Sequence, residues 1–119
     1  MSLQHNHGIR DPTATELAWI QLLMSVPFPG RDELEQQLRV CRVRPVDAEG
    51  SLELRLPANV HKAAVKGRVP VELAGRDTDG VGVHVLLHVV DGLAVEIEVF
   101  KASGTEILQM PKDWEVSTL

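Results

Sequence analysis

The side chains best suited to acid–base chemistry lie close together in the second half of the chain. They are His84, His88, Glu96 and Glu98. A carboxylate beside an imidazole favours the charged form of the ring, and in a cleft such a pair acts as general acid and base. We expect His84 to lie opposite Glu98 in a hairpin. On the wet face of a sheet, the same pair would be only a cross-strand ion pair.

The spacing of the histidines argues against a metal site. His84 and His88 are four residues apart, which in a strand separates their Cα atoms by ~13 Å at ~3.4 Å per residue. Two nitrogens that share a metal ion must both lie within ~2.1 Å of it. His5 and His7 stand in an N-terminal segment with nothing beside them to orient a ligand. We therefore expect no metal ion and no other cofactor.

Other motifs do not form a site. Neither the phosphate-binding loop G-x-x-x-x-G-K-[ST] nor a strand–G-x-G-x-x-G–helix unit occurs. Asp77, Asp79 and Gly80 are spaced as in a calcium loop, but Leu86 stands where its last carboxylate would be, so we expect these acids to form a turn. The lone cysteine, Cys41, is predicted to be a buried, inert thiol on the inner face of a strand.

Composition limits the classes of partner. The 119-residue chain has 12 Lys and Arg against 17 Asp and Glu, a formal charge of −5, and 3% aromatic residues. An acidic chain poor in rings is unsuited to nucleic acid. No apolar run approaches the ~20 residues of a membrane helix, and the N-terminus lacks the apolar segment of a signal peptide. The single cysteine fits a reducing compartment, so we expect a cytoplasmic protein. From its charge, its few rings and its short apolar runs, we expect it to bind neither nucleic acid nor membrane.

Two helices are expected near the N-terminus. Thr13 and Glu16 have the capping-box spacing, and the apolar residues that follow repeat with a helical period until Pro27. A second helix is expected over 31–38, with acids in its first turns, where the helix dipole favours negative charge. Residues 1–11 are expected to form a flexible tail, and 12–119 a single domain.

From Arg39 the apolar period changes to two, which predicts strands. The expected strands are 41–44, 51–56, 69–74, 81–90 and 93–100, with a short edge strand over 106–109. Residues 57–67 fit either a short helical turn or a loop. Tight turns imply antiparallel neighbours. We therefore predict an α+β domain in which two N-terminal helices pack on one face of a mostly antiparallel sheet of about five strands.

The turn at 91–92 joins two strands whose register decides which side chains meet. A two-residue turn would pair Val90 with Leu93 and set the two glutamates against an apolar row. A three-residue loop pairs Val89 with Leu93 instead and aligns the apolar residues of both strands, so burial favours it. The apolar pairs are then Val83 with Val99, Val85 with Ile97, Leu87 with Val95, and Val89 with Leu93. The other face pairs His84 with Glu98, Leu86 with Glu96, and His88 with Ala94.

Four further side chains form a predicted partner surface. Leu86 and Phe100 are apolar residues on an otherwise polar sheet face, and such spots can mark an interaction site or a homodimer contact. Arg42 and Arg44 belong to a small basic cluster, for which a solvated surface is the simpler interpretation.

Three stretches support a resemblance to known proteins. They are VPFPGRDEL at 26–34, LLHVVDGL at 86–93 and EIEV at 96–99. Together they resemble small single-domain bacterial proteins of unknown function, over residues 12–115. That class has no established activity, so the resemblance implies no functional residues.

The absence of an assembled catalytic site favours a non-catalytic module that binds another protein, or a second copy of itself, through the polar sheet face or a sheet edge. The alternative is a small-molecule-binding protein or a small enzyme. Its acid–base groups would be the two histidines and two glutamates, lining a pocket between the helices and the sheet. The two hypotheses differ in whether these four side chains lie on an open sheet face or in a concave pocket.

Overall fold

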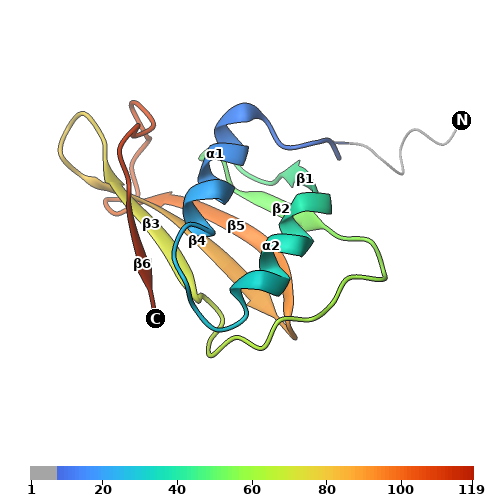
Figure 1. The fold of residues 1–119 in the computed structure, drawn as a ribbon. Coiled ribbons are helices and arrows are strands. Elements are labelled where there is room, and N and C mark those ends of the chain that lie inside the picture. Colours follow the sequence, from blue (N-terminus) through green and yellow to red (C-terminus); the bar gives the residue numbers. More distant parts are fainter. Residues whose placement is uncertain (1–7) are drawn as a thin grey trace, which may run out of the picture.

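The computed structural model describes residues 8–119 (Figure 1). Two helices, α1 (Ala14–Leu23) and α2 (Arg31–Val40), precede six strands. The strands are β1 (Arg42–Pro45), β2 (Leu52–Arg55), β3 (Val71–Arg76), β4 (Gly82–Val90), β5 (Leu93–Lys101) and β6 (Glu115–Thr118). They form one antiparallel sheet in the order β1-β2-β5-β4-β3-β6, with both helices on one face. The predicted α+β fold is confirmed, with six described strands rather than about five.

The first helix begins as its sequence predicts. Oγ1 of Thr13 accepts a hydrogen bond from the N–H of Glu16 at 3.2 Å, and the carboxylate of Glu16 accepts one from the N–H of Thr13 at 2.9 Å. The second helix ends at Val40 rather than at Leu38. Neither of these helices of the described chain is long and apolar enough to cross a membrane.

Of the tail expected over 1–11, residues 1–7 lie outside the described residues, and so do His5 and His7. Arg10 forms an antiparallel bridge with Val43 through two N–H···O bonds of 2.9 and 2.8 Å. Its guanidinium donates to both carboxylate oxygens of Glu16, at 2.7 and 2.9 Å. These bonds from Arg10 hold the pKa of Glu16 below its ordinary value. Arg10 thus attaches the segment before α1 to the outer edge of β1.

The core lies between the helices and the inner face of the sheet. The alternate residues of each central strand point inward, as the period of two predicts. The core residues include Trp19, Leu23, Leu34, Leu38, Val43, Leu52, Leu73, Val83, Val85, Leu87, Ile97 and Val99. Trp114 is half-buried against the same cluster. Apolar side chains therefore fill the space between the helices and the sheet.

The β4–β5 hairpin combines a two-residue turn with a β-bulge. Asp91 and Gly92 both have positive φ, 53° and 77°, as a type I′ turn requires. Val90 pairs with Leu93, but the pairing then shifts by one residue, and Val95 is left as the extra residue of the bulge. The predicted three-residue loop was wrong, because the bulge rather than the loop aligns the apolar rows. Ala94 is the core-facing residue here, not Leu93 or Val95.

Two connecting segments resolve or correct other predictions. Residues 57–67 contain no helix and form a loop, one of the two expected structures. Residues 106–109 are not a strand. The carboxylate of Asp77 accepts hydrogen bonds from the N–H groups of Leu108 and Gln109, at 2.7 and 2.9 Å, so these backbone donors are not available to a sheet. The edge strand beside β3 is β6 instead.

Candidate functional site

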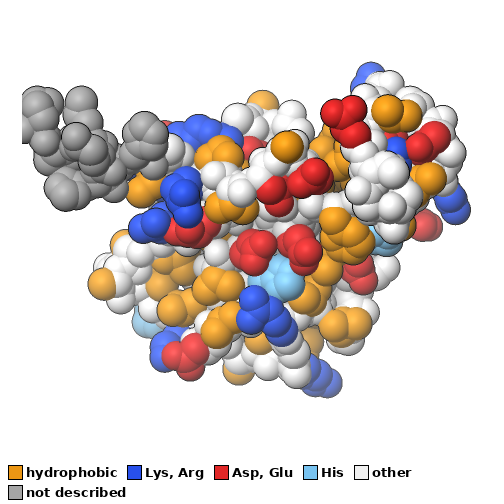
Figure 2. Space-filling view, turned by 180° about the vertical axis from the view of Figure 1, so that it is seen from behind, with side chains coloured by type: hydrophobic (Ala, Val, Ile, Leu, Met, Phe, Trp, Pro, Cys, Tyr) orange, Lys and Arg blue, Asp and Glu red, His pale blue; other side chains and the backbone are white. Residues whose placement is uncertain are grey.

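The four acid–base candidates lie on the sheet face that the helices leave uncovered, here called the open face (Figure 2). The outward side chains that define this face are Arg42, Arg44, Glu53, Arg55, Glu72, His84, Leu86, His88, Glu96, Glu98 and Phe100. His84 and His88 come from β4, and Glu96 and Glu98 from β5. They do not line a pocket between the helices and the sheet, because the apolar core occupies that space.

The register gives each histidine a different neighbour from the predicted one. His84 lies opposite Phe100, with the ring centroids 5.0 Å apart and the planes at 19°. His88 lies opposite Glu96, but its Nε2 is 2.8 Å from an oxygen of Glu98, the diagonal neighbour. The predicted pairing of His84 with Glu98 is therefore wrong, and Glu98 contacts His88.

Both ring nitrogens of His88 are engaged. Nε of Arg68 donates to Nδ1 of His88 at 2.9 Å. Since a guanidinium can only donate, Nδ1 carries no proton, and the neutral ring must carry its proton on Nε2 and donate it to Glu98. His88 is thus held between a cation and a carboxylate, with only 14% of its side chain exposed. No ring nitrogen is left to exchange a proton with a substrate.

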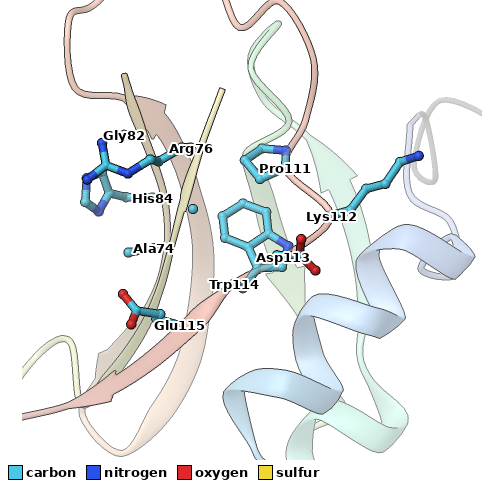
Figure 3. Close-up of a pocket in the computed structure, with 10 residues that line it drawn as sticks. Ala74, Arg76, Gly82, His84, Pro111, Lys112, Asp113, Trp114 and Glu115 are labelled. Atoms are coloured by element: carbon cyan, nitrogen blue, oxygen red, sulfur yellow. The ribbon is translucent and has the colours of Figure 1, made fainter. Parts of the chain in front are cut away.

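His84 lines a cleft of about 590 Å³ around the edge of β3. The other lining residues are Ala74, Gly75, Arg76, Gly82, Pro111, Lys112, Asp113, Trp114 and Glu115. In Figure 3, His84 and Glu115 lie on one side of β3, and Pro111 and Trp114 on the other. A Cβ on Gly75 would lie 2.8 Å from Cβ of Pro111 and 3.0 Å from Cε3 of Trp114, so the loop rests directly on this strand. The indole and the imidazole therefore do not face each other across the cleft.

Charges on the open face are sorted by strand. A basic strip of Arg42, Arg44 and Arg55 lies on β1 and β2. An acidic strip of Glu72, Glu96 and Glu98 lies on β3 and β5. In Figure 2, several Lys and Arg side chains gather toward the left of the face, and Asp and Glu side chains lie nearer its middle, where one further Lys or Arg side chain stands beside a histidine. Both strips belong to one continuous surface.

Glu53 lies between the two strips and is paired with the basic one. It accepts a hydrogen bond from Arg44 at 2.7 Å and forms a second ion pair with Arg55. The bond from Arg44, more than any other contact, holds the pKa of Glu53 below its ordinary value. Arg42 forms a looser pair with Asp11 at 3.6 Å, and half of its side chain is exposed.

Like charges also stand directly opposite each other on this face. Glu53 pairs in register with Glu96, and Arg42 with Arg55. Such pairs destabilise a sheet. The Glu96 carboxylate forms no ion pair and no side-chain hydrogen bond with any described residue, because its neighbour His88 turns to Glu98 instead. Glu96 therefore has uncompensated charge near the middle of the sheet.

The two apolar residues predicted to form a partner surface are both on the open face. Leu86 is half-buried between Glu72 on β3 and Glu98 on β5. Phe100 is half-buried and covered in part by the ring of His84. The open face therefore has two half-buried apolar residues, of which Leu86 lies between two carboxylates.

A buried ion cluster at the end of β5 was not predicted. Nζ of Lys101, whose side chain is 1% exposed, donates to Asp77 at 2.9 Å and to Asp79 at 2.7 Å. Burial works to raise the pKa of Asp77, but hydrogen bonds from Lys101 and from backbone N–H groups outweigh it and hold the pKa below its ordinary value. The bond to Asp79 contributes most to the raised pKa of Lys101. The two aspartates thus hold a lysine as well as forming a turn. The sequence did contain a signal for this cluster, because the alternation in β5 places the charged side chain of Lys101 on the inner face.

Gln37 is a second buried polar residue that sequence reasoning missed. Its Nε2 donates to the carbonyls of His61 and Gly92, at 2.7 and 2.9 Å. Its Oε1 accepts the N–H of Ala94 at 2.8 Å. Through these hydrogen bonds, Gln37 connects α2 to the β4–β5 turn and to the 57–67 loop, which is a structural role.

The thiol of Cys41 is buried, as predicted, and burial raises its pKa to about 11. Within residues 8–119, no group of three or more His, Cys, Asp or Glu side chains is arranged to hold a metal ion.

Comparisons with known proteins identify the family of the chain but no activity. No curated protein and no solved structure matches the chain. A domain of unknown function (DUF6984) matches residues 9–111, which is most of the sequence. The resemblance to a small domain family of unknown function is thereby confirmed, and the chain belongs to the DUF6984 family.

Proposed function

We propose that the chain is a non-catalytic protein-binding module whose contact surface is the open face. The observation that supports this most is a sheet with helices on one side only, whose other side presents Leu86 and Phe100 among charged residues. Apolar side chains surrounded by charged ones are typical of protein interfaces. The uncompensated charge of Glu96 is a second support, because a contact outside the chain could neutralise it.

An acid–base enzyme is the weaker proposal. Both nitrogens of His88 are engaged by Arg68 and Glu98, so a substrate would have to displace one of these contacts to reach the ring. Glu96 has no imidazole partner, although His88 is its cross-strand neighbour. The cleft beside His84 favours a small-molecule site, but its aromatic wall lies on the other side of β3. A second cleft of about 590 Å³ lies at α1 and α2, and none of the four acid–base candidates lines it.

We further propose that the module works in the bacterial cytoplasm. Its single thiol supports this, because a reducing compartment suits a free, buried cysteine.

The experiment compares three immobilised proteins in pull-downs from a native bacterial lysate. They are the wild type, the double variant Leu86→Ser with Phe100→Ser, and the control Leu17→Ser, which removes an exposed apolar side chain from α1. We expect a protein that the wild type and the control retain and the double variant loses. Thermal unfolding checks that each variant is folded. Equal retention by all three, or equal loss by the control, would refute the open face as the contact surface.

A further inference from the structure

We propose that the cleft between α1 and α2 binds a small uncharged molecule that has an apolar body and one hydroxyl or carbonyl group. The cleft has a volume of about 590 Å³ and is lined by residues of the two helices and of the segments that flank them. Both helices lie on the face of the sheet opposite to the open face (Figure 1), so this inference goes beyond the proposed function and does not depend on it. A concave site of this size, mostly apolar with a few polar groups, is typical of small-molecule binding.

Helix α1 has a second apolar stripe beside the one that packs on the sheet. Trp19 and Leu23 belong to the core between the helix and the sheet. The cleft is lined by residues with the spacing i, i+3, i+4 and i+7, which places them on one side of the helix: Leu17, Ile20, Gln21 and Met24. Leu17 is outside the core cluster, and 46% of it is exposed. Packing on the sheet requires only one apolar stripe, so a contact in the cleft better explains the position of Leu17.

The two large clefts of the described chain differ in their linings. Ile20, Met24 and Leu38 are buried residues of the core cluster that also line the α1–α2 cleft, so its floor is apolar. A ligand on this floor would extend the core. The cleft beside His84 has the same volume, but five ionisable side chains line it: Arg76, His84, Lys112, Asp113 and Glu115. The α1–α2 cleft is therefore the one suited to an apolar ligand.

The surface around the α1–α2 cleft has almost no uncompensated charge. Residues 12–30 contain one charged side chain, Glu16, which is buried and accepts two hydrogen bonds from Arg10. On the other helix, Glu35 and Arg39 lie one turn apart and pair with each other at 3.9 Å. An unpaired charge is costly to remove from water, so this lining favours an uncharged ligand.

The polar groups of the cleft indicate one hydrogen bond to the ligand. Oγ of Ser25 donates to the carbonyl of Leu22 at 2.6 Å, and Sγ of Cys41 donates to that of Leu38 at 3.4 Å. Burial raises the pKa of the Cys41 thiol to about 11, so the thiol is uncharged at pH 7. The exposed amide of Gln21 makes no hydrogen bond with any other described residue, and it can bond a hydroxyl or carbonyl group of a ligand.

A series of three probes of similar size tests the proposal by NMR on the full chain. At pH 7 benzyl alcohol is uncharged, benzylamine is a cation and benzoate is an anion. The protein is labelled with ¹³C at its methionine methyl groups. Met24 lines the cleft and reports on binding, whereas Met110 packs against the core outside the cleft and is the internal control. Met24→Leu identifies the signal of Met24.

We expect benzyl alcohol to shift the Met24 signal saturably, with a dissociation constant in the millimolar range that suits so small a ligand. The Met110 signal should stay in place. The dissociation constants of benzylamine and benzoate should be about tenfold higher or more, because each would bring an unpaired charge to the apolar floor.

Leu17→Lys puts a charge on the wall of the cleft and should raise the dissociation constant of benzyl alcohol about tenfold. Val90→Lys is the matched control, since Val90 is also an exposed apolar residue, at 42%, and does not line the cleft. The control should bind benzyl alcohol as the wild type does. The probe series uses the unchanged protein, so it tests the proposal even if Leu17→Lys does not fold.

Three results would each overturn the proposal. They are no saturable shift of the Met24 signal, equal shifts of the Met24 and Met110 signals, and a charged probe that binds as tightly as benzyl alcohol. None of them bears on the pull-down, which tests the open face, so the two proposals can fail separately.

Discussion

Gln37→Leu is the substitution whose effect follows most directly from the structure. The fully buried amide makes three hydrogen bonds that join α2, the β4–β5 turn and the 57–67 loop. Leucine fills a similar volume but leaves the buried N–H of Ala94 without an acceptor, which costs ~1–3 kcal/mol. The carbonyl of Gly92 keeps its bond from the N–H of Ala63 at 2.9 Å, and His61 is an exposed residue, so the two lost bonds together add about 1 kcal/mol. We expect a loss of about 2–4 kcal/mol in the free energy of unfolding.

Urea unfolding, followed by the fluorescence of the two tryptophans, measures this loss. Gln36→Leu is the matched control, since the neighbouring residue is exposed on the same helix and should change stability by no more than ~0.5 kcal/mol. Equal effects of the two substitutions would refute the structural role of Gln37. Amide exchange gives a second readout, because the N–H of Ala94 should lose its protection in Gln37→Leu and keep it in the control.

Gln37→Glu extends the same test to pH. The new carboxyl would face two carbonyls, so only its protonated form can donate a hydrogen bond to them. Its pKa in the folded state should therefore rise above the ~4.3 of an unfolded glutamate. The folded state then binds more protons than the unfolded state, and stability falls as pH rises from ~4 toward 7. A stability difference from wild type that stays constant over this range would contradict the arrangement.

Three further predictions concern other residues. Asp77→Asn should lower the urea midpoint at pH 7. The difference from wild type should shrink as pH falls below ~4, because the hydrogen bonds that lower the pKa of Asp77 stabilise the fold only while its carboxylate is ionised. Glu96→Gln should raise the free energy of unfolding by about 0.5 kcal/mol, since it removes a like-charge pair; unchanged or lower stability would contradict this. Cys41 should react with iodoacetamide at pH 8 far more slowly in the native state than in urea, because burial raises its pKa to about 11.

Helices and strands could be predicted because their signals are local. The capping box at Thr13 and Glu16 lies within one turn, and the alternation in β4 lies within one strand. The partners of the buried polar residues gave no such local signal. Gln37 lies 57 residues from Ala94 and 55 from Gly92, and only the folded chain brings them together. Lys101 lies 24 residues from Asp77, in the loop before β4. Hydrogen bonds between buried polar groups that are far apart in the sequence therefore could not be predicted from local patterns.

The β-bulge in β5 also went unpredicted. Ala94, the residue before the extra residue Val95, donates its N–H to Gln37 on α2. The two-residue turn and the bulge together place Val85 opposite Val99, whereas the predicted loop placed it opposite Ile97. The register therefore differs from the predicted one by two residues.

Beyond the bulge, an even shift of register keeps each side chain on its face and changes only the neighbour that it meets. For this reason the open face holds the residues that alternation assigned to it, including His84, Leu86, Glu98 and Phe100. The predicted acid–base pair depended on the neighbour, and it failed, because Phe100 replaces Glu98 opposite His84. A hypothesis about a contact surface requires only that the residues lie on the same side of the sheet. A catalytic hypothesis also requires that two particular side chains lie next to each other. Sequence patterns in a hairpin of this kind therefore support inferences about contact surfaces more strongly than inferences about reacting pairs.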